Sequence, residues 1–386
     1  MDSTDFAQVL ASVREFVRRR VLPLEQEIDD KDEIPETIQQ AARDMGLFGF
    51  AIPEQYGGLG VSMVEESRLV MELGYTTPSL RSLFGTNNGI AGHTLLEGGT
   101  EEQKQEWLPR IASGRTVASF ALTEAEAGSD PSDMRTSARR EEDRWVLNGT
   151  KRYITNAPVA ELFMTYARTD RDRPARRGIS TFLVTRDMPG VTVGPRDHKM
   201  GQFGAWTADV SFDDVVVPHA SLVGGDTGVH TGYTTAMKCL AHGRVHIAAL
   251  CVGMIERALD ESVAYASTRR QGGQAIGAFQ LIQGLIADTA TDLYAARALV
   301  TDVAARFDDG TDRKVGPSAA KYFASEAVGR AVDRAVQIHG GAGYMRGVTV
   351  ERLFRDARLF RIYEGTSQIQ QVIIARALLG EAALGQ

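Results

Sequence analysis

The hydrophobic periodicity of this chain changes twice, and this change constrains the fold more than any other feature of the sequence. From Phe6 to about Gly114, apolar residues recur at helical spacing. Between Arg144 and Val217 the apolar runs become short and rich in β-branched and aromatic residues, with turn residues between them. Helical spacing returns at about Thr231 and lasts to the end of the chain. The sequence therefore predicts a helical region, a small β region and a second helical region.

The β region carries one short-range pairing signal and several further strand-like runs. Asn148-Gly149 lies between two strand-forming segments, and this dipeptide is typical of a tight hairpin turn. Four more strand-like runs follow, over residues 162–167, 181–184, 191–193 and 208–217. We therefore predict a hairpin at Asn148-Gly149 within a small β domain.

Long helices are expected on both sides of that β domain. Thr100 and Gln103 form the pattern of a capping box that starts a helix reaching Ile111. Three helical patterns fill most of the C-terminal part, over residues 231–269, 279–307 and 315–339. A chain of 386 residues also exceeds one ordinary hydrophobic core. We predict three domains, over residues 1–116, 117–228 and 229–386.

Charge and composition argue against several classes of function. The formal net charge of -7 does not suit a nucleic-acid binder, which needs a basic face. No apolar run approaches the roughly 20 residues that span a bilayer, so no membrane partner is expected. The acidic N-terminus lacks the apolar segment of a signal peptide, which predicts a cytoplasmic protein. Cys239 and Cys251 are expected as buried thiols in a reducing compartment.

Three familiar catalytic or binding motifs are missing. His242 and His246 stand four residues apart on a predicted helix, which is the spacing of two zinc ligands. Gly243 follows His242, however, so the His-Glu-x-x-His motif is absent, no third ligand is evident, and no metal site is expected. No Gly-x-Ser-x-Gly elbow and no Rossmann glycine fingerprint occurs either.

The strongest catalytic candidate, Glu364, follows an apolar helical pattern near the C-terminus. It stands between Tyr363 and Gly365, on a short connection before the last helix. A glutamate among apolar groups has a raised pKa and can accept a proton from carbon. Ser367 and Gln370 have the spacing of a capping box for that last helix. The alternative is that Glu364 lies in the first turn of the helix, where carboxylates are common.

Three other segments could contact a polar, planar ligand. Residues 120–130 combine small and hydroxyl residues with exposed main chain, although a structured loop has the same composition. Tyr153 and Thr155 would share one side of a strand, as ordinary strand residues also do. Gln337 precedes a glycine cluster at 340–343 that could meet a pyrophosphate, or could simply end a helix.

Taken in order, these segments resemble the acyl-CoA dehydrogenase family over nearly the whole chain. The matching segments are Leu122-Thr123-Glu124 with Ala127-Gly128-Ser129-Asp130, Tyr153-Ile154-Thr155-Asn156, Arg269 with Gln271, Phe279-Gln280, Gln337-Ile338-His339-Gly340-Gly341, Arg355-Asp356-Ala357 and Ile362-Tyr363-Glu364-Gly365-Thr366. The resemblance implies a mainly α fold with a middle, barrel-like β domain. It also implies an N-terminal helical domain, a C-terminal four-helix bundle, and FAD lying between the subunits of a homotetramer.

The resemblance also implies an activity in fatty acid metabolism. Glu364 would remove the α-proton of an acyl-CoA, the β-hydrogen would leave as hydride to the flavin, and a trans-2-enoyl thioester would form. Electrons would pass to an electron-transfer flavoprotein. Three alternatives stay open: an oxidase that uses oxygen, an enzyme acting on an acyl group bound to a carrier protein, and a helical assembly protein without the chemistry.

The family pattern assigns the remaining site residues by position in this sequence. Residues expected at FAD are Phe120, Leu122, Thr123, Gly128, Ser129, Tyr153, Ile154, Thr155, Arg269, Gln280, Gln337, Gly340, Gly341, Thr366 and Gln368. Residues expected at the acyl ligand are Ser129, Arg244 and Gly365. Some members of the family place the base immediately before the arginine, where this chain has Gly243, so the assignment rests on Glu364.

Four residues depart from the family pattern. Tyr153 stands where tryptophan is usual, which exchanges one ring for another. Ala125 replaces a proline in the flavin loop, and Gly272 replaces a phenylalanine, which predicts weaker cofactor packing from the neighbouring subunit. Ala241 replaces an aspartate that contacts the ligand in many members, so the thioester carrier stays open.

Overall fold

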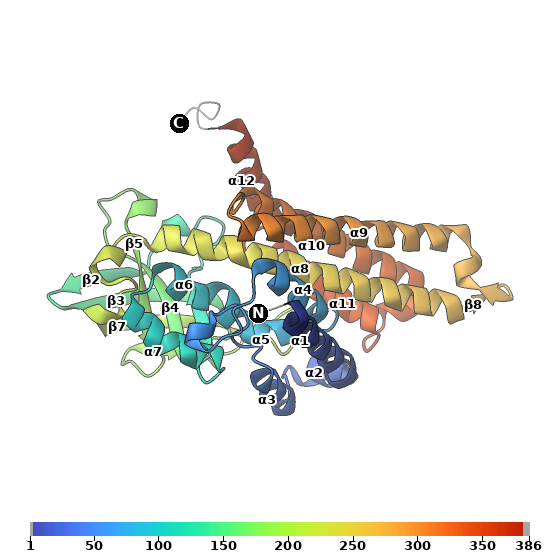
Figure 1. Cartoon of the computed structure of the whole chain (residues 1–386), viewed down its shortest axis with the longest axis horizontal. Coiled ribbons are helices and arrows are strands. Elements are labelled where there is room, and N and C mark those ends of the chain that lie inside the picture. Colours follow the sequence, from blue (N-terminus) through green and yellow to red (C-terminus); the bar gives the residue numbers. More distant parts are fainter. Residues whose placement is uncertain (1–2, 381–386) are drawn as a thin grey trace.

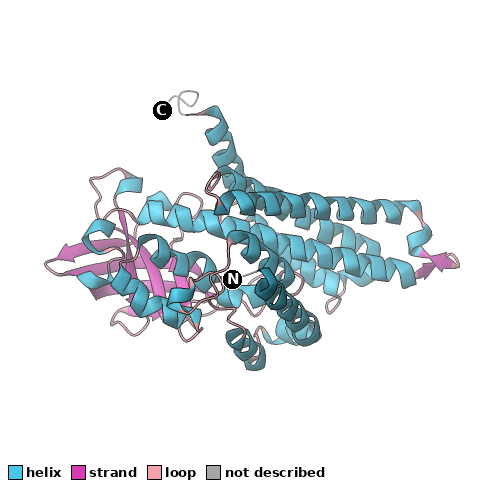
Figure 2. Ribbon diagram, in the orientation of Figure 1, coloured by secondary structure: helices cyan, strands magenta, loops and turns pink. Residues whose placement is uncertain are grey.

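The protein is an elongated molecule with a β-sheet at one end and long helices extending to the other (Figure 1). The computed structural model describes residues 3–380. Helices make up most of this part, and the strands gather in one place apart from a short pair at the far tip of the long helices (Figure 2). The predicted fold class, mainly α with a middle β domain, is confirmed. The domain boundaries at residues 116 and 228 stay a prediction.

The N-terminal region is helical, as predicted. Its α-helices are α1 (Ser3–Phe16), α2 (Glu25–Lys31), α3 (Glu36–Asp44), α4 (Met63–Leu73), α5 (Pro78–Gly85), α6 (Ala91–Gly98) and α7 (Glu101–Ala112). The capping box predicted at Thr100 is confirmed, since the Thr100 side chain accepts from the Gln103 backbone and the Gln103 side chain accepts from the Thr100 backbone. Ser62 and Glu65 form a second capping box at the start of α4.

The middle region is a single sheet of seven strands. They are β1 (Ala118–Ala121), β2 (Ser137–Glu141), β3 (Arg144–Thr155), β4 (Leu162–Arg168), β5 (Ile179–Thr185), β6 (Val191–Val193) and β7 (Thr207–Pro218). Their order is β1-β4-β2-β3-β7-β6, with β5 paired to β4. The four strand-like runs after residue 160 are confirmed as β4, β5, β6 and β7, whereas the short strands β1 and β2 were not predicted.

The hairpin predicted at Asn148-Gly149 is wrong. β3 continues through this dipeptide, and the chain instead turns near Glu142, between β2 and β3. Gly149 lies at a register shift of the β3–β7 pairing and has φ of 147°. A Cβ atom there would lie 2.6 Å from Cα of Thr136. The glycine therefore allows two segments of the backbone to pack closely and does not form a turn.

The C-terminal region consists of long helices. They are α8 (Gly232–Thr268), α9 (Gln280–Asp308), α10 (Val315–His339), α11 (Thr349–Ala357) and α12 (Ser367–Leu379). α8, α9 and α10 lie side by side along the length of the molecule, and the short strands β8 (Arg270–Gln271) and β9 (Gln274–Ala275) lie at their far tip (Figure 1). The three helical patterns predicted here match these helices to within one residue at each end.

α8 is the central helix of the molecule. It packs against α4, α9 and α10. Residues 245–252 are all buried, so this part of the helix is enclosed on every side. By length and composition α8 could cross a membrane, but 89% of its most apolar window is buried inside the protein, as in a core helix. Cys239 and Cys251 on this helix are free and buried, as predicted.

Candidate active site

Glu364 lies on the connection before α12, as the sequence predicts. α12 begins at Ser367, and Thr366 caps it by accepting a 3.2 Å hydrogen bond from the backbone of Ile369. The alternative that placed Glu364 in the first turn of this helix is therefore wrong. The predicted capping pair is also wrong, because the Ser367 hydroxyl donates to Glu326 and the Gln370 side chain donates to the carbonyl oxygens of residues 364 and 365.

The Glu364 carboxyl group points into the protein against α8. Its side chain is 9% exposed, and a Cβ atom on Gly243 would lie 2.1 Å from its Oε2. Among the residues that the structure describes, Oε2 has no hydrogen-bond partner. Burial raises the pKa of Glu364, and the cations of Arg81 and Lys321 oppose that shift. A buried carboxylate with a free oxygen and a raised pKa can accept a proton.

Two buried arginines stand near this carboxyl group. Nη2 of Arg81, on α5, lies 4.0 Å from Oε1 of Glu364. Arg244 on α8 is also buried, and burial lowers its pKa while the Glu364 carboxylate raises it. The Nε atoms of both arginines lack hydrogen-bond partners within the described part of the chain. The structure thus brings Arg244, which the sequence predicts at the acyl ligand, close to Glu364, together with Arg81, which was not predicted.

A buried ion pair shapes the loop that follows β1. Nζ of Lys151, on β3, lies 2.8 Å from the Glu124 carboxylate, and it also donates a 3.1 Å bond to the carbonyl oxygen of Leu122. Glu124 accepts from the backbone amides of Arg135 and Thr136 as well. The backbone of residues 122–124 is therefore fixed from two sides. This pair was missed because the two residues are far apart in sequence and each looks like a surface residue.

The residues predicted for FAD fall into three groups in the structure. On β1, β3 and the loop after β1 lie Phe120, Leu122, Thr123, Gly128, Ser129, Tyr153, Ile154 and Thr155. At the far end of the long helices lie Arg269, Gln280, Gln337, Gly340 and Gly341. Beside Glu364 lie Thr366 and Gln368, with Gly365 between them and Glu364.

One protomer does not bring the first two groups together, since they lie at opposite ends of the molecule (Figure 1). The far group sits beside an open concavity lined by Ile276, Phe279, Gln280 and Ile338. Large hydrophobic side chains nearby are exposed to solvent: Leu281 is 87% exposed and Tyr344 is 85% exposed. Within one protomer, therefore, these two groups cannot line a single cofactor site.

The residues near the β-sheet fit a flavin. Tyr153 is 59% exposed, and the guanidinium of Arg152 lies over its ring, 4.9 Å from the centroid, which leaves the opposite face for stacking. A Cβ atom on Gly128 would meet nothing within 4 Å, so the main chain there is open to a ligand. Ile154, by contrast, is buried in the sheet core, which leaves its main chain as the part that could reach a cofactor. An open loop held by a buried ion pair, beside an exposed ring, suits a polar planar group.

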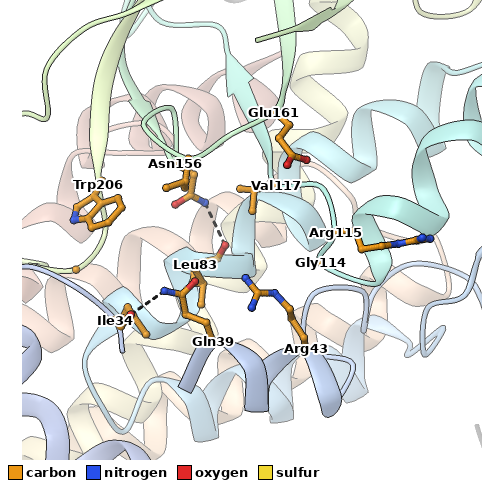
Figure 3. Close-up of a pocket in the computed structure, with 12 residues that line it drawn as sticks. Ile34, Gln39, Arg43, Leu83, Gly114, Arg115, Val117, Asn156, Glu161 and Trp206 are labelled. Atoms are coloured by element: carbon orange, nitrogen blue, oxygen red, sulfur yellow. Dashed lines mark hydrogen bonds between the residues drawn. The ribbon is translucent and has the colours of Figure 1, made fainter. Parts of the chain in front are cut away.

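A separate cavity of about 220 Å³ lies between the N-terminal helices and the sheet (Figure 3). Its lining includes Ile34, Leu83, Asn156 and Trp206. Asn156 points across it and donates to the backbone of α5 at Ser82 and Leu83. None of the site residues predicted from the sequence lines this cavity, so it is distinct from the region around Glu364.

Family models match most of the chain. The N-terminal domain of acyl-CoA dehydrogenases matches residues 3–115, the middle domain matches 119–215, and the C-terminal domain matches 230–379. An acyl-CoA dehydrogenase of Bacillus subtilis is 39% identical over 95% of this chain and 96% of its own length. A subunit of the caffeyl-CoA reductase–Etf complex of Acetobacterium woodii is 40% identical over 92% of each chain.

Solved structures of acyl-CoA dehydrogenases also match the chain over nearly its whole length. Butyryl-CoA dehydrogenase from Megasphaera elsdenii is 32% identical, with a TM-score of 0.93 over 98% of this chain and all of its own. A complex of glutaryl-CoA dehydrogenase with glutaryl-CoA is 32% identical, with a TM-score of 0.92 over 100% of this chain and 98% of its own. An FAD complex of an acyl-CoA dehydrogenase from Bacillus anthracis is 31% identical, with a TM-score of 0.90 over 100% of this chain and 68% of its own. The chain therefore belongs to the acyl-CoA dehydrogenase family, whose members are FAD-dependent oxidoreductases acting on CH-CH groups.

Proposed function

We propose that this protein oxidises an acyl-CoA to a trans-2-enoyl-CoA, with Glu364 as the base that removes the α-proton. The observation that carries the proposal is the buried carboxyl oxygen that lies against Gly243 and has no partner among the described residues. A carboxylate that is already satisfied by hydrogen bonds is a poor base. A carboxylate left free in a buried site is ready to take a proton from a ligand.

The backbone near Glu364 supports this role. An α-proton becomes acidic enough to leave when negative charge on the thioester oxygen is stabilised. Within the described residues, the backbone N–H of Glu364 donates to no other group, so it is available to a ligand. FAD, when bound, supplies a ring that accepts the β-hydrogen as hydride. The protein then needs to supply alignment, a base and an oxyanion donor.

Assembly and electron transfer follow from the same arrangement. We assign the far group of cofactor residues, which includes Arg269, Gln280 and Gln337, to the FAD of a neighbouring subunit in a homotetramer. The exposed apolar side chains near that group would be covered in such an assembly. We further assign an electron-transfer flavoprotein as the acceptor, since one relative is a subunit of a complex with Etf.

A second candidate substrate is favoured by Arg81. A buried guanidinium whose Nε lacks a partner in the described chain would gain from an anionic ligand group. One solved relative is glutaryl-CoA dehydrogenase bound to glutaryl-CoA, and a glutaryl chain ends in a carboxylate. An acyl-CoA with a carboxylate at its far end is therefore the second candidate, beside a short, uncharged acyl-CoA.

Anaerobic titration with a panel of acyl-CoA thioesters tests the function. The purified holoenzyme is mixed with butyryl-CoA, glutaryl-CoA and longer acyl-CoAs, and bleaching of the flavin absorbance is followed. Bleaching by at least one of them, with an enoyl thioester as product, supports the proposal. Bleaching only by an acyl group on a carrier protein would instead assign that carrier.

Two further outcomes identify the alternatives. Release of hydrogen peroxide in air at the rate of turnover would identify an oxidase. A protein that takes up no FAD would contradict the enzyme assignment.

A further inference from the structure

Lys321 is a buried lysine whose ammonium group reaches the loop that carries Glu364. Its side chain comes from α10 and is 0% exposed. Nζ donates a 2.7 Å hydrogen bond to the carbonyl oxygen of Gly365. Burial lowers the pKa of Lys321 to about 8, which reflects the cost of enclosing a cation here. An apolar residue of similar length would fill the space without this cost, so the charge itself requires a reason.

The loop that Lys321 contacts has an unfavourable backbone conformation. Glu364 and Gly365 both have positive φ, of 52° and 92°. A residue with a Cβ atom adopts such values where its surroundings hold it there. Nε2 of Gln370 donates to the carbonyl oxygens of Glu364 at 3.1 Å and of Gly365 at 2.9 Å. The neutral amide of Gln370 thus holds both carbonyl oxygens, and the cation of Lys321 holds that of Gly365 as well.

The Lys321 ammonium group also lowers the pKa of the Glu364 carboxyl group. The charged and titratable groups that affect it come from α8, with Cys251 and Arg244, from α10, with Glu326, and from the loop, with Glu364. Burial raises the pKa of Glu364, and Lys321 is one of the cations that oppose this shift. Gln370 has no charge and so cannot share this second effect.

We propose that Lys321 is a positioning residue for the dehydrogenation: its ammonium group, bonded to the carbonyl oxygen of Gly365, holds the loop of Glu364 in place and sets a positive charge beside the residue that carries the carboxylate. The inference rests on the proposed role of Glu364 as base. The loop of Glu364 receives two different contributions from its neighbours. Lys321 provides geometry and charge, whereas Gln370 provides geometry alone.

Three holoenzyme variants test this division: Lys321→Met, Gln370→Leu and Val328→Ala. Each is reduced anaerobically with butyryl-CoA, or with the acyl-CoA that bleaches the wild type fastest, over a range of pH. Lys321→Met should keep its FAD and lose about a hundredfold in the limiting rate of flavin reduction. Its acid limb, the fall in rate as the pH is lowered, should also lie at a higher pH than that of the wild type. Gln370→Leu should be slower without a shift of this acid limb. Val328→Ala removes core packing from α10 and should lower only the melting temperature.

The outcomes distinguish this inference from the proposed function. A Lys321→Met enzyme with a normal rate, or a slow enzyme with an unshifted acid limb, would overturn the inference. If this variant does not fold, Lys321→Arg replaces it: a slower rate with the wild-type acid limb supports the charge effect, and a shifted limb overturns it. Normal flavin reduction by Glu364→Gln would refute the proposed function itself, whereas an inactive Glu364→Gln beside a normal Lys321→Met would refute only the role of Lys321.

Discussion

Oε2 of Glu364 occupies the space in which a side chain on residue 243 would begin. A Cβ atom built on Gly243 would lie 2.1 Å from that oxygen, closer than any unbonded pair of atoms can come. Because α8 is packed on all sides there, the helix cannot move away to relieve such a contact. Glu364 in this position and a side chain at residue 243 therefore exclude each other. By the resemblance, some members of the family carry their base at the position of Gly243. With Glu364 placed as it is here, that position has no room for a second carboxylate.

Gly243→Ala tests this steric relationship. The added methyl group should push the Glu364 carboxyl group away from its present position and slow flavin reduction about a hundredfold. The matched control is Gly194→Ala after β6, where a Cβ atom would come no closer than 3.6 Å to Asp209, an ordinary contact, so its rate should match that of the wild type. Anaerobic stopped-flow reduction by the same acyl-CoA compares the two variants. Equal rates for Gly243→Ala and the wild type would contradict the relationship.

The pH dependence of flavin reduction should follow the ionisation of Glu364. Burial raises the pKa of this carboxyl group, and the protonated form cannot act as a base. The rate should therefore be full above the raised pKa and fall as the pH drops through it. The midpoint should lie above about 4.3, the ordinary value for glutamate. Reduction of the same flavin by dithionite needs no base and serves as the control, which should lack this limb.

Arg81 should control preference among acyl groups. In the Arg81→Met variant, the ratio of kcat/KM for glutaryl-CoA to that for butyryl-CoA should fall about a hundredfold if the guanidinium binds the far carboxylate. The ratio is the useful quantity because Arg81 also lowers the pKa of Glu364, which affects both substrates alike. Arg257→Met, which removes another buried arginine paired with Glu25 and Glu261, is the control. An unchanged ratio in Arg81→Met would assign this arginine to the base alone.

The Lys151–Glu124 pair should hold the flavin loop in place. Lys151→Met leaves the Glu124 carboxylate buried without its cation, which should cost about 3 to 5 kcal/mol of the free energy of unfolding. The double variant Lys151→Met/Glu124→Gln removes the stranded charge and should recover part of that loss. Thermal melting and the amount of FAD retained after gel filtration are the measurements. If the double variant is less stable than Lys151→Met, the explanation from a stranded charge is wrong.

Much of the fold could be predicted from the sequence because its long helices have clear periodicity. The pattern over residues 315–339 gave α10 with both ends correct, and Thr100 marked the start of α7. Asn148-Gly149 misled because β3 pairs on both sides, with β2 and β7, and this tertiary pairing outweighs a local turn preference. The predicted cap Ser367 lies one residue after the true cap, Thr366, because the Gln370 side chain bonds back to the loop that carries Glu364.

The candidate site could be predicted only in part. Glu364 stands in a recognisable motif, Arg244 matches a family arginine by position, and the structure brings the two close together. Arg81, Lys151 and Lys321 were missed, since a lone cation in a helix or strand gives no sign of the carboxylate or carbonyl group that it meets across the fold. A lysine such as Lys321, placed beside the alanines of an otherwise apolar helix face, is the one local signal that could have identified such a residue. The tetramer, the acceptor and the cytoplasmic location stay predictions.

The most direct measurement is anaerobic flavin reduction in Glu364→Gln, a change that keeps the shape of the side chain and removes its basicity. The variant should bind FAD as the wild type does, and dithionite should reduce it normally. Bleaching by the acyl-CoA that reduces the wild type fastest should be slower by about a thousandfold. Bleaching at the wild-type rate would show that another group removes the proton and would contradict the account.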